Sequence, residues 1–183
     1  NERGGEFRIE RIGGPAVPEP LTAERLATGL ATSAQFVHGI ASPFANWTRL
    51  FREHPNQFPA IDQSIFQKGG GAKDIYYAHV YWRIAPDEAW VIEVTPPECY
   101  YWNFQLDNWW MESHDYRFRQ ITVNKHSARI EPDGSVRIIC AARDPGCGNW
   151  IDTCRHREGT ALLRWAGASE HPLPKAKIVK LED

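Results

Sequence analysis

The stretch Pro96–Phe118, PPECYYWNFQLDNWWMESHDYRF, decides the fold because eight aromatic residues fall within it. Burial of each ring contributes roughly 4–6 kcal/mol gross, at about 25 cal/mol per Å² of apolar surface. From residue 100 to residue 107, apolar and polar side chains alternate. One side carries Tyr100, Trp102, Phe104 and Leu106, and the other carries Tyr101, Asn103, Gln105 and Asp107. This period of two predicts a strand with one face in the core and one face rich in hydrogen-bonding groups.

Six further runs also have a β pattern. They are Ile75–Ile84, Ala89–Val94, Tyr116–Asn124, His126–Glu131, Ser135–Ala141 and Thr160–Trp165. A hairpin signal, Pro132-Asp133-Gly134, separates two of them, and residues 178–181 predict an edge strand. Many short strands without a βαβ alternation predict a mainly β (α+β) fold, an antiparallel β-sandwich, and disfavour a Rossmann-type nucleotide site.

Two amphipathic helices are predicted before the strands. Thr22 is a suitable N-cap, and apolar residues follow it at helical spacing as far as Ile40, which predicts a first helix over residues 22–39. Pro43 occupies the first-turn position of a second predicted helix, which ends at His54. We expect this N-terminal helical pair to pack on one face or end of the sheets.

A chain of 183 residues is long enough for one domain with a sizeable core, so residues 1–183 are predicted to form a single domain. An extended leader (1–21) precedes a helical segment (22–60) and the β-sandwich (70–183). The glycines at 69–71 lack the order of a phosphate-binding loop and predict a flexible loop. Because Asn1 is not an initiator methionine, we expect the chain to pair with further polypeptide.

The composition disfavours several classes of partner. Lys and Arg number 21 and Asp and Glu number 23, so the net charge of −2 provides no general attraction for nucleic acid or an anionic membrane. No apolar run approaches the roughly 20 residues that span a bilayer. The four cysteines, Cys99, Cys140, Cys147 and Cys154, lack the spacing of zinc ligands. We therefore predict no metal, no cofactor and reduced thiols in a cytoplasmic protein.

Five longer segments carry a family resemblance. They are EVTPPECYYWNFQLDNWWMES (93–113), VNKH (123–126), DGSVRI (133–138), DPGCGNWIDT (144–153) and GTALLRWAGA (159–168). Together they resemble the bacterial family called domain of unknown function 1214, most closely its actinobacterial members, from about Leu21 onward. The resemblance implies a β-sandwich of jelly-roll type at the C-terminal end of longer proteins, and hence a missing N-terminal half. It implies no catalytic residues, because the family's activity is unknown.

Seven residues are predicted to contact a ligand: Tyr101, Asn103, Gln105, His79, Arg83, Asn149 and Asp152. The imidazole of His79 titrates near neutral pH, and strand alternation places it on the same face as Arg83. Asn149 and Asp152 lie in a glycine-rich loop, where they either cap tight turns or face a ligand. For each of the seven, a hydrogen bond that only supports the structure is the alternative.

Two functions remain open. In the first, an aromatic-walled, partly polar pocket binds, and in an enzyme turns over, a sugar-like or lipid-like small molecule. A carboxylate pair among Asp107, Glu112 and Asp115 would serve acid–base chemistry in such a pocket. In the second, the domain is a non-catalytic assembly module that packs on the N-terminal half or, as a homo-oligomer, on another subunit. A partly polar cavity favours the first function and a large exposed apolar patch favours the second.

Overall fold

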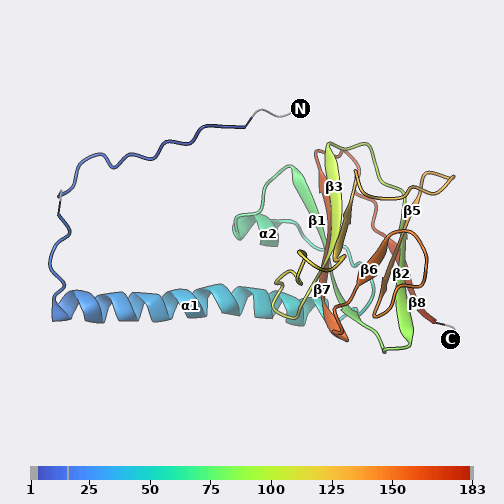
Figure 1. Cartoon of the computed structure of the whole chain (residues 1–183), viewed down its shortest axis with the longest axis horizontal. Coiled ribbons are helices and arrows are strands. Elements are labelled where there is room, and N and C mark those ends of the chain that lie inside the picture. The colour runs from blue at the N-terminus through green and yellow to red at the C-terminus, as the bar shows by residue number, and fades with distance from the viewer. Residues whose placement is uncertain (1–3, 16, 182–183) are drawn as a thin grey trace. The chain divides into compact units, whose positions relative to one another are not determined.

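The computed structural model describes residues 4–15 and 17–181, and the chain divides into two compact units, Asn1–Gly39 and Ile40–Asp183. The helices are α1 (Ala23–Phe51) and α2 (Ser64–Lys68). The strands are β1 (Ile75–Arg83), β2 (Glu88–Val94), β3 (Tyr101–Asp107), β4 (Thr122–Asn124), β5 (Val136–Ala141), β6 (Trp150–Asp152), β7 (Glu158–Ala166) and β8 (Lys175–Lys180). All of these strands and α2 belong to the second unit (Figure 1).

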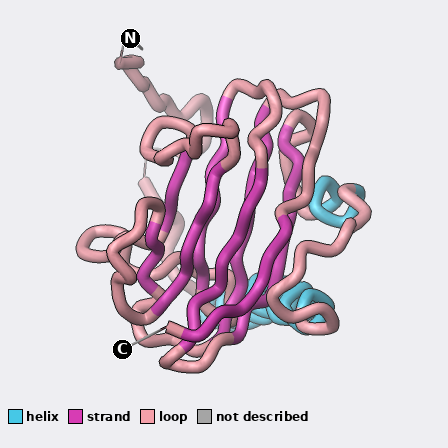
Figure 2. Tube along the Cα trace, turned by 90° about the vertical axis from the view of Figure 1, so that its right-hand side faces the viewer, coloured by secondary structure: helices cyan, strands magenta, loops and turns pink. Residues whose placement is uncertain are grey.

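The strands form two four-stranded sheets, so the protein is mainly β as predicted (Figure 2). The first sheet has the order β1-β7-β3-β4 and the second has the order β6-β5-β2-β8. Neighbouring strands are antiparallel except β5 and β6, which pair in parallel. The parallel pair departs from the predicted antiparallel arrangement, because the loop over residues 142–149 returns the chain before β6 begins.

Aromatic rings from both sheets form the core. Trp102 and Trp165 of the first sheet meet edge to face with their centroids 6.1 Å apart. Phe104 of the first sheet meets Trp90 of the second sheet at the same distance. All four rings are buried, and so is Leu106. The alternation in residues 102–107 is therefore confirmed, and it fixes which face of β3 enters the core.

Of the aromatic residues in this stretch, Trp102 and Phe104 belong to this core. The prediction that Tyr100 lies on the core side is wrong, because this residue precedes β3 and is 82% exposed. Trp110, Tyr116 and Phe118 are 53%, 70% and 79% exposed. The chain turns away from the sheet at Asn108, whose side-chain oxygen accepts hydrogen bonds from the backbone N–H groups of Trp110 at 2.8 Å and Glu112 at 3.1 Å. An Asx turn of this kind competes with strand pairing, so the aromatic residues after it leave the sheet.

Five predicted strands are confirmed as β1, β2, β3, β5 and β7, and the edge strand is β8. Two predictions are wrong: Tyr116–Asn124 is a strand only over β4, and His126–Glu131 forms none. In the second case the Asn124 side chain accepts hydrogen bonds from the backbone N–H groups of His126 at 2.9 Å and of Ser127 at 3.1 Å. These local bonds replace the ladder that a strand would need.

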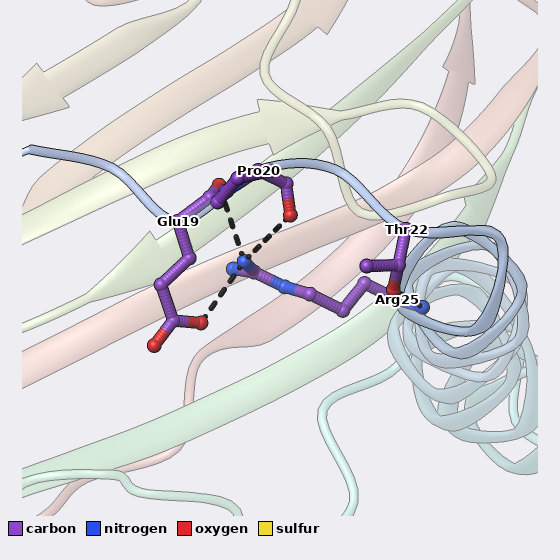
Figure 3. Close-up of polar contacts among 4 residues, drawn as sticks. All are labelled: Glu19, Pro20, Thr22 and Arg25. Atoms are coloured by element: carbon purple, nitrogen blue, oxygen red, sulfur yellow. Dashed lines mark hydrogen bonds and ion pairs between the residues drawn. The ribbon is translucent and has the colours of Figure 1, made fainter.

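The predicted helical pair is a single helix, because α1 continues through Pro43. Proline removes one hydrogen bond, to the carbonyl of Gly39, and in α1 that loss does not end the helix. The division between the two units falls at the same residue. Thr22 caps the helix as predicted, with its hydroxyl accepting a hydrogen bond from the Arg25 N–H at 3.2 Å. The Arg25 guanidinium also reaches back to the carboxylate of Glu19 at 3.1 Å (Figure 3).

The last turns of α1 pack into the second unit. Thr48 and Phe51 are buried, and the Thr48 hydroxyl donates a hydrogen bond to the carbonyl of Trp109 at 2.9 Å. In the first unit the apolar residues Leu26, Leu30 and Val37 are 49%, 64% and 66% exposed. Within the described residues, no helix is both long enough and apolar enough to cross a membrane.

Candidate functional site

The outer face of the first sheet, opposite the core, is the floor of a cavity. Residues directly opposite each other in antiparallel strands share a face. In the register His79, Leu162 and Gln105 form one row across β1, β7 and β3. The rows on either side are Tyr77, Arg164 and Asn103, and then Tyr81, Thr160 and Asp107. The floor therefore brings together an imidazole, a guanidinium, an amide and a carboxyl group.

Aromatic rings from α1 and α2 cover this floor and leave a cavity of about 300 Å³. Phe51 of α1 stacks on His79 with centroids 4.9 Å apart, and Phe66 of α2 lies 4.6 Å from the same imidazole. Trp47 meets Phe66 edge to face at 5.5 Å. Figure 1 shows α2 beside β1, on the side of the first sheet that faces away from the second sheet. The site thus has aromatic walls and a polar floor.

The segment around α2 is held against the edge of β1. The Gln63 side chain accepts a hydrogen bond from the Tyr77 N–H at 2.9 Å and donates one to the Tyr77 carbonyl at 3.1 Å. The Tyr77 hydroxyl accepts from the Ala72 N–H at 3.0 Å. A Cβ on Gly71 would lie 2.9 Å from the carbonyl oxygen of Phe66, so only glycine lets the loop close this tightly. The 69–71 loop is therefore a fixed part of the cavity wall.

His79 is a buried imidazole without a hydrogen-bond partner. Its side chain is 4% exposed, and its Nδ1 atom is unpaired among the described residues. Burial, and secondly the charge of Arg164, lower the pKa of His79 to about 3. The ring is therefore neutral at physiological pH and has one N–H donor and one nitrogen acceptor.

Asp107 is a buried carboxyl group whose charge is costly. Its Oδ1 atom accepts a hydrogen bond from the Gln105 amide at 2.6 Å. Burial raises the pKa of Asp107 to about 6, against the lowering effects of that hydrogen bond and of Arg164. A carboxyl group with a pKa near 6 can both donate and accept a proton close to neutral pH.

Arg164 is the positive charge of the cavity. It lies on β7 between Tyr77 and Asn103, and it is only half-buried. Within the described part of the chain, no carboxylate lies within 4.0 Å of its guanidinium, although its charge affects both His79 and Asp107. Its five N–H donors therefore remain without an acidic partner.

The structure places the seven predicted residues in four locations. His79 and Gln105 line the cavity. Tyr101 and Asn103 share the face of Gln105 on β3 but do not line the cavity, and Tyr101 contacts the ring of His126 at 6.2 Å. The shared face follows from strand alternation, whereas the limits of the cavity depend on where α1 and α2 end.

Arg83 lies at the end of β1, outside this cavity. Asn56 binds its backbone through two hydrogen bonds, to the Arg83 N–H at 2.8 Å and carbonyl at 2.9 Å. Its side chain instead lines a recess with Glu88 and Glu158. Arg83 shares the strand face of His79 as predicted, but it does not line the cavity.

Asn149 and Asp152 are far from the cavity and cap backbone groups. The backbone of Asn149 has a φ of 57°. Its side chain accepts a hydrogen bond from the N–H of Arg129 at 2.7 Å and donates one to the carbonyl of Arg129 at 2.8 Å. The Asp152 carboxylate pairs with Arg119 at 2.9 Å and accepts from the Cys154 N–H at 2.7 Å. Neither residue lines the cavity, and the polar atoms of both side chains are bonded to other parts of the protein.

The seven predicted ligand contacts include neither Asp107 nor Arg164, and the prediction of aromatic walls does not say that Phe51 and Phe66 form them. A signal for Arg164 exists, since it is the one charged residue within the apolar run Thr160–Trp165. Asp107 was considered as one of a carboxylate pair, but Asp115 is engaged with Arg117 at 2.9 Å instead. Phe51 and Phe66 had no signal, because only the packing of α1 and α2 brings them over the sheet.

A second polar cluster lies apart from the cavity. The rings of His114 and His156 are 4.4 Å apart, and burial lowers the pKa of His114 to about 4. Its Nε2 atom has no hydrogen-bond partner in the described residues. No group of three or more His, Cys, Asp or Glu side chains in residues 4–15 and 17–181 is placed to hold a metal ion. The four cysteines are free thiols.

The chain is similar to two solved structures. One is the crystal structure of an uncharacterized protein from Burkholderia cenocepacia, with 48% sequence identity and a TM-score of 0.86 over 94% of this chain and 48% of that chain. The other is a protein from Vibrio parahaemolyticus, with 14% identity and a TM-score of 0.47 over 88% of this chain and 47% of that chain. No family model and no curated protein matches the sequence. The chain thus spans about half the length of the two chains it resembles.

Proposed function

We propose that the protein binds a compact small molecule in the cavity over the first sheet, with His79, Asp107 and Gln105 as its polar contacts. The observation that carries the proposal is the unpaired Nδ1 atom of His79, a residue that is 4% exposed and lines a cavity of about 300 Å³. A buried polar group without a partner costs about 1–3 kcal/mol, and a ligand hydrogen bond would offset that cost. The aromatic walls would hold an apolar or ring-shaped ligand body.

The same groups support turnover as well as binding. An acid–base residue works best when its pKa lies near the operating pH, and the pKa of Asp107 is raised to about 6. The neutral His79 can donate or accept a hydrogen bond without carrying charge. A volume at the lower end of ligand-site sizes favours a ligand of one ring or a short chain, within the sugar-like and lipid-like classes.

Replacement of His79 by phenylalanine tests the proposal. The Phe ring would keep the stacking on Phe51 and Phe66 and remove the unpaired nitrogen. We expect the variant to unfold at an equal or higher temperature, and to lose the small molecules that native mass spectrometry detects on protein from its own host. Asn103→Leu is the matched control, because Asn103 shares the sheet face outside the cavity. Equal ligand retention in His79→Phe and wild type contradicts the proposal.

We further propose that the two sheets form a β-sandwich of jelly-roll type and that the chain is a member of the bacterial domain of unknown function 1214. The support is local: the segments that carry the resemblance supply β3, β5, β6 and β7. Residues 102–106 and 159–165 also supply core or cavity floor. Free thiols on all four cysteines support a reducing compartment, the cytoplasm, as its location.

A second candidate function is assembly with another polypeptide. The first-unit part of α1 leaves Leu26, Leu30 and Val37 uncovered by residues of its own unit, at one helical face. The occupant we propose is polypeptide equivalent to the part of the Burkholderia chain that this chain does not span. Co-expression of the two parts tests this: a complex that survives gel filtration supports it, and separate elution contradicts it.

A further inference from the structure

We infer that the ligand of the cavity carries an anionic group of the carboxylate type, which Arg164 binds, and that Asp107 takes up a proton when this ligand binds. The inference rests on the proposed function and names the class of its ligand. It starts from the arrangement of charges over the floor of the cavity.

The first step is that Arg164 has no acidic partner. It is on β7, and the described residues hold no carboxylate within ion-pair distance of it. Arg83, on the same sheet, also has no carboxylate within ion-pair distance among the described residues. It differs because Glu88 and Glu158 line its recess, whereas the acidic residue that lines the cavity of Arg164 is Asp107, whose charged form burial disfavours. A guanidinium is the group that recognises planar carboxylates through two parallel hydrogen bonds. An unpaired arginine beside aromatic walls is therefore suited to a ligand with an acidic group on an apolar body.

The second step is the separation of Arg164 from Asp107. Asp107 is opposite Thr160, four residues along β7 from Arg164. At about 3.3 Å per residue their backbone positions are about 13 Å apart along the strands, and the charge of Arg164 still acts on Asp107. Leu162, His79 and Gln105 form the row between them. A ligand of one ring can then place its acidic group at Arg164 and extend toward Asp107.

The third step concerns the proton. The groups that face Asp107 are His79 and Tyr81 from β1, Gln105 from β3 and Arg164 from β7. The lining residues from α1 and α2 are Phe44, Trp47 and Phe66, none of which titrates. A bound anion would neutralise the field of Arg164 and displace water, and both effects favour the neutral form of Asp107. Binding is therefore linked to proton uptake.

Binding of 3-phenylpropionate and its neutral analogue 3-phenylpropionamide, measured by NMR titration at pH 5.5 and 7.5, tests the inference. We expect the carboxylate to bind at least fivefold more tightly than the amide at pH 5.5. We expect its affinity to fall at least fivefold at pH 7.5, with the affinity of the amide unchanged. Arg164→Gln should abolish the preference for the carboxylate, whereas the matched control Arg83→Gln should retain it. Asp107→Asn should remove the pH dependence and tighten carboxylate binding at pH 7.5.

The outcomes separate the inference from the proposed function. Equal binding of the two probes, or a preference for the amide, overturns the inference and leaves the small-molecule site standing. Carboxylate binding that survives Arg164→Gln, or that keeps its pH dependence in Asp107→Asn, also overturns it. If neither probe binds the wild-type protein at millimolar concentration, the acidic-ligand inference is wrong. The proposed small-molecule function is then tested separately, by native mass spectrometry of protein from its own host.

Discussion

At the scale of single residues, two buried titratable groups lie on one sheet face, and burial disfavours the charged form of each. His79 has a pKa lowered to about 3 and Asp107 has a pKa raised to about 6, and burial is the largest cause in each case. Burial of either group costs more free energy than burial of the apolar residues that usually lie on a strand face under a helix. Natural proteins retain such groups where they serve binding or chemistry, which is the reason to place the function here.

We predict that Asp107→Asn stabilises the protein at pH 7.5. Folding raises the pKa of Asp107 from 3.8 to about 6, so the folded protein holds the proton more tightly than the unfolded chain does. The free energy of unfolding is therefore highest below the pKa of the unfolded chain, and it falls as the pH rises through about 6. Asparagine has no charge to bury and can still accept the hydrogen bond from Gln105. A shift of about two pKa units corresponds to about 2–3 kcal/mol in the free energy of unfolding.

Urea denaturation at pH 7.5 and at pH 4 measures this effect. The free energy of unfolding of Asp107→Asn should exceed that of the wild type at pH 7.5. The difference should shrink toward zero at pH 4, where the wild-type carboxyl group is protonated in the folded state. Asp133→Asn is a surface control, because Asp133 lies in an exposed turn. A variant that is less stable than wild type at pH 7.5 would show that the Asp107 charge is well solvated.

The sequence predicted part of this site because strand alternation is a local property. His79 and Gln105 could be assigned to a shared outer face from their own strands. Asn149 and Asp152 do not line this cavity, because loop residues of that type serve turns as readily as ligands. Arg164 leaves a local signal as the charged residue of an apolar run, whereas the position of Phe51 and Phe66 over the sheet depends on how segments distant in sequence pack together.

At the scale of elements, the cavity depends on a short segment held against the edge of β1. Gln63 bonds to both backbone groups of Tyr77, and α2 presents Phe66 over His79. This cover also blocks the free edge of β1, where another strand would otherwise pair. The segment was predicted as a flexible loop, because five helical residues are too few to leave a periodic signal.

We predict that Gly71→Ala destabilises the second unit and opens the cavity. The new Cβ would lie 2.9 Å from the carbonyl oxygen of Phe66 and 3.2 Å from the ring of Tyr77, both of which are fixed. The loop must shift, at a cost of about 1–3 kcal/mol in the free energy of unfolding. Thermal unfolding and amide hydrogen exchange around residues 63–77 measure it. An unchanged melting temperature with unchanged exchange would mean that the loop moves freely.

Strands and helices were predicted with different success, for a physical reason. Residues 102–106 of β3 alternate between buried and half-buried, whereas the central residues of β1 and β2 are continuous buried runs, and both patterns mark strands. The helix boundary at Pro43 was wrong because the cost of one lost hydrogen bond is smaller than that of breaking a helix of 29 residues. The strand β6 has three residues and no period to detect.

At the scale of the whole molecule, each face of the first sheet has its own role. The inner face packs Trp102, Phe104 and Trp165 into the core with the second sheet. The outer face carries His79, Asp107 and Arg164 under the cover of α1 and α2. The large aromatic core supplies the stability that lets the outer face keep its costly polar groups.

The last prediction concerns association. Leu26, Leu30 and Val37 follow helical spacing along one face of α1, and no described residue of the first unit covers them. An apolar face of this kind self-associates when its partner polypeptide is absent. We expect light scattering to show concentration-dependent association of the chain alone, and the double variant Leu30→Glu, Val37→Glu to be monomeric. Near-ultraviolet circular dichroism should not change, because the tryptophans that dominate it are in the second unit.

Addition of the complementary polypeptide should convert the self-associated wild-type chain into a defined complex. The double variant should form no such complex, because it lacks the apolar contact face. A wild-type chain that remains monomeric at all concentrations and does not bind that polypeptide would contradict the assembly proposal, and the small-molecule proposal would then be tested by itself.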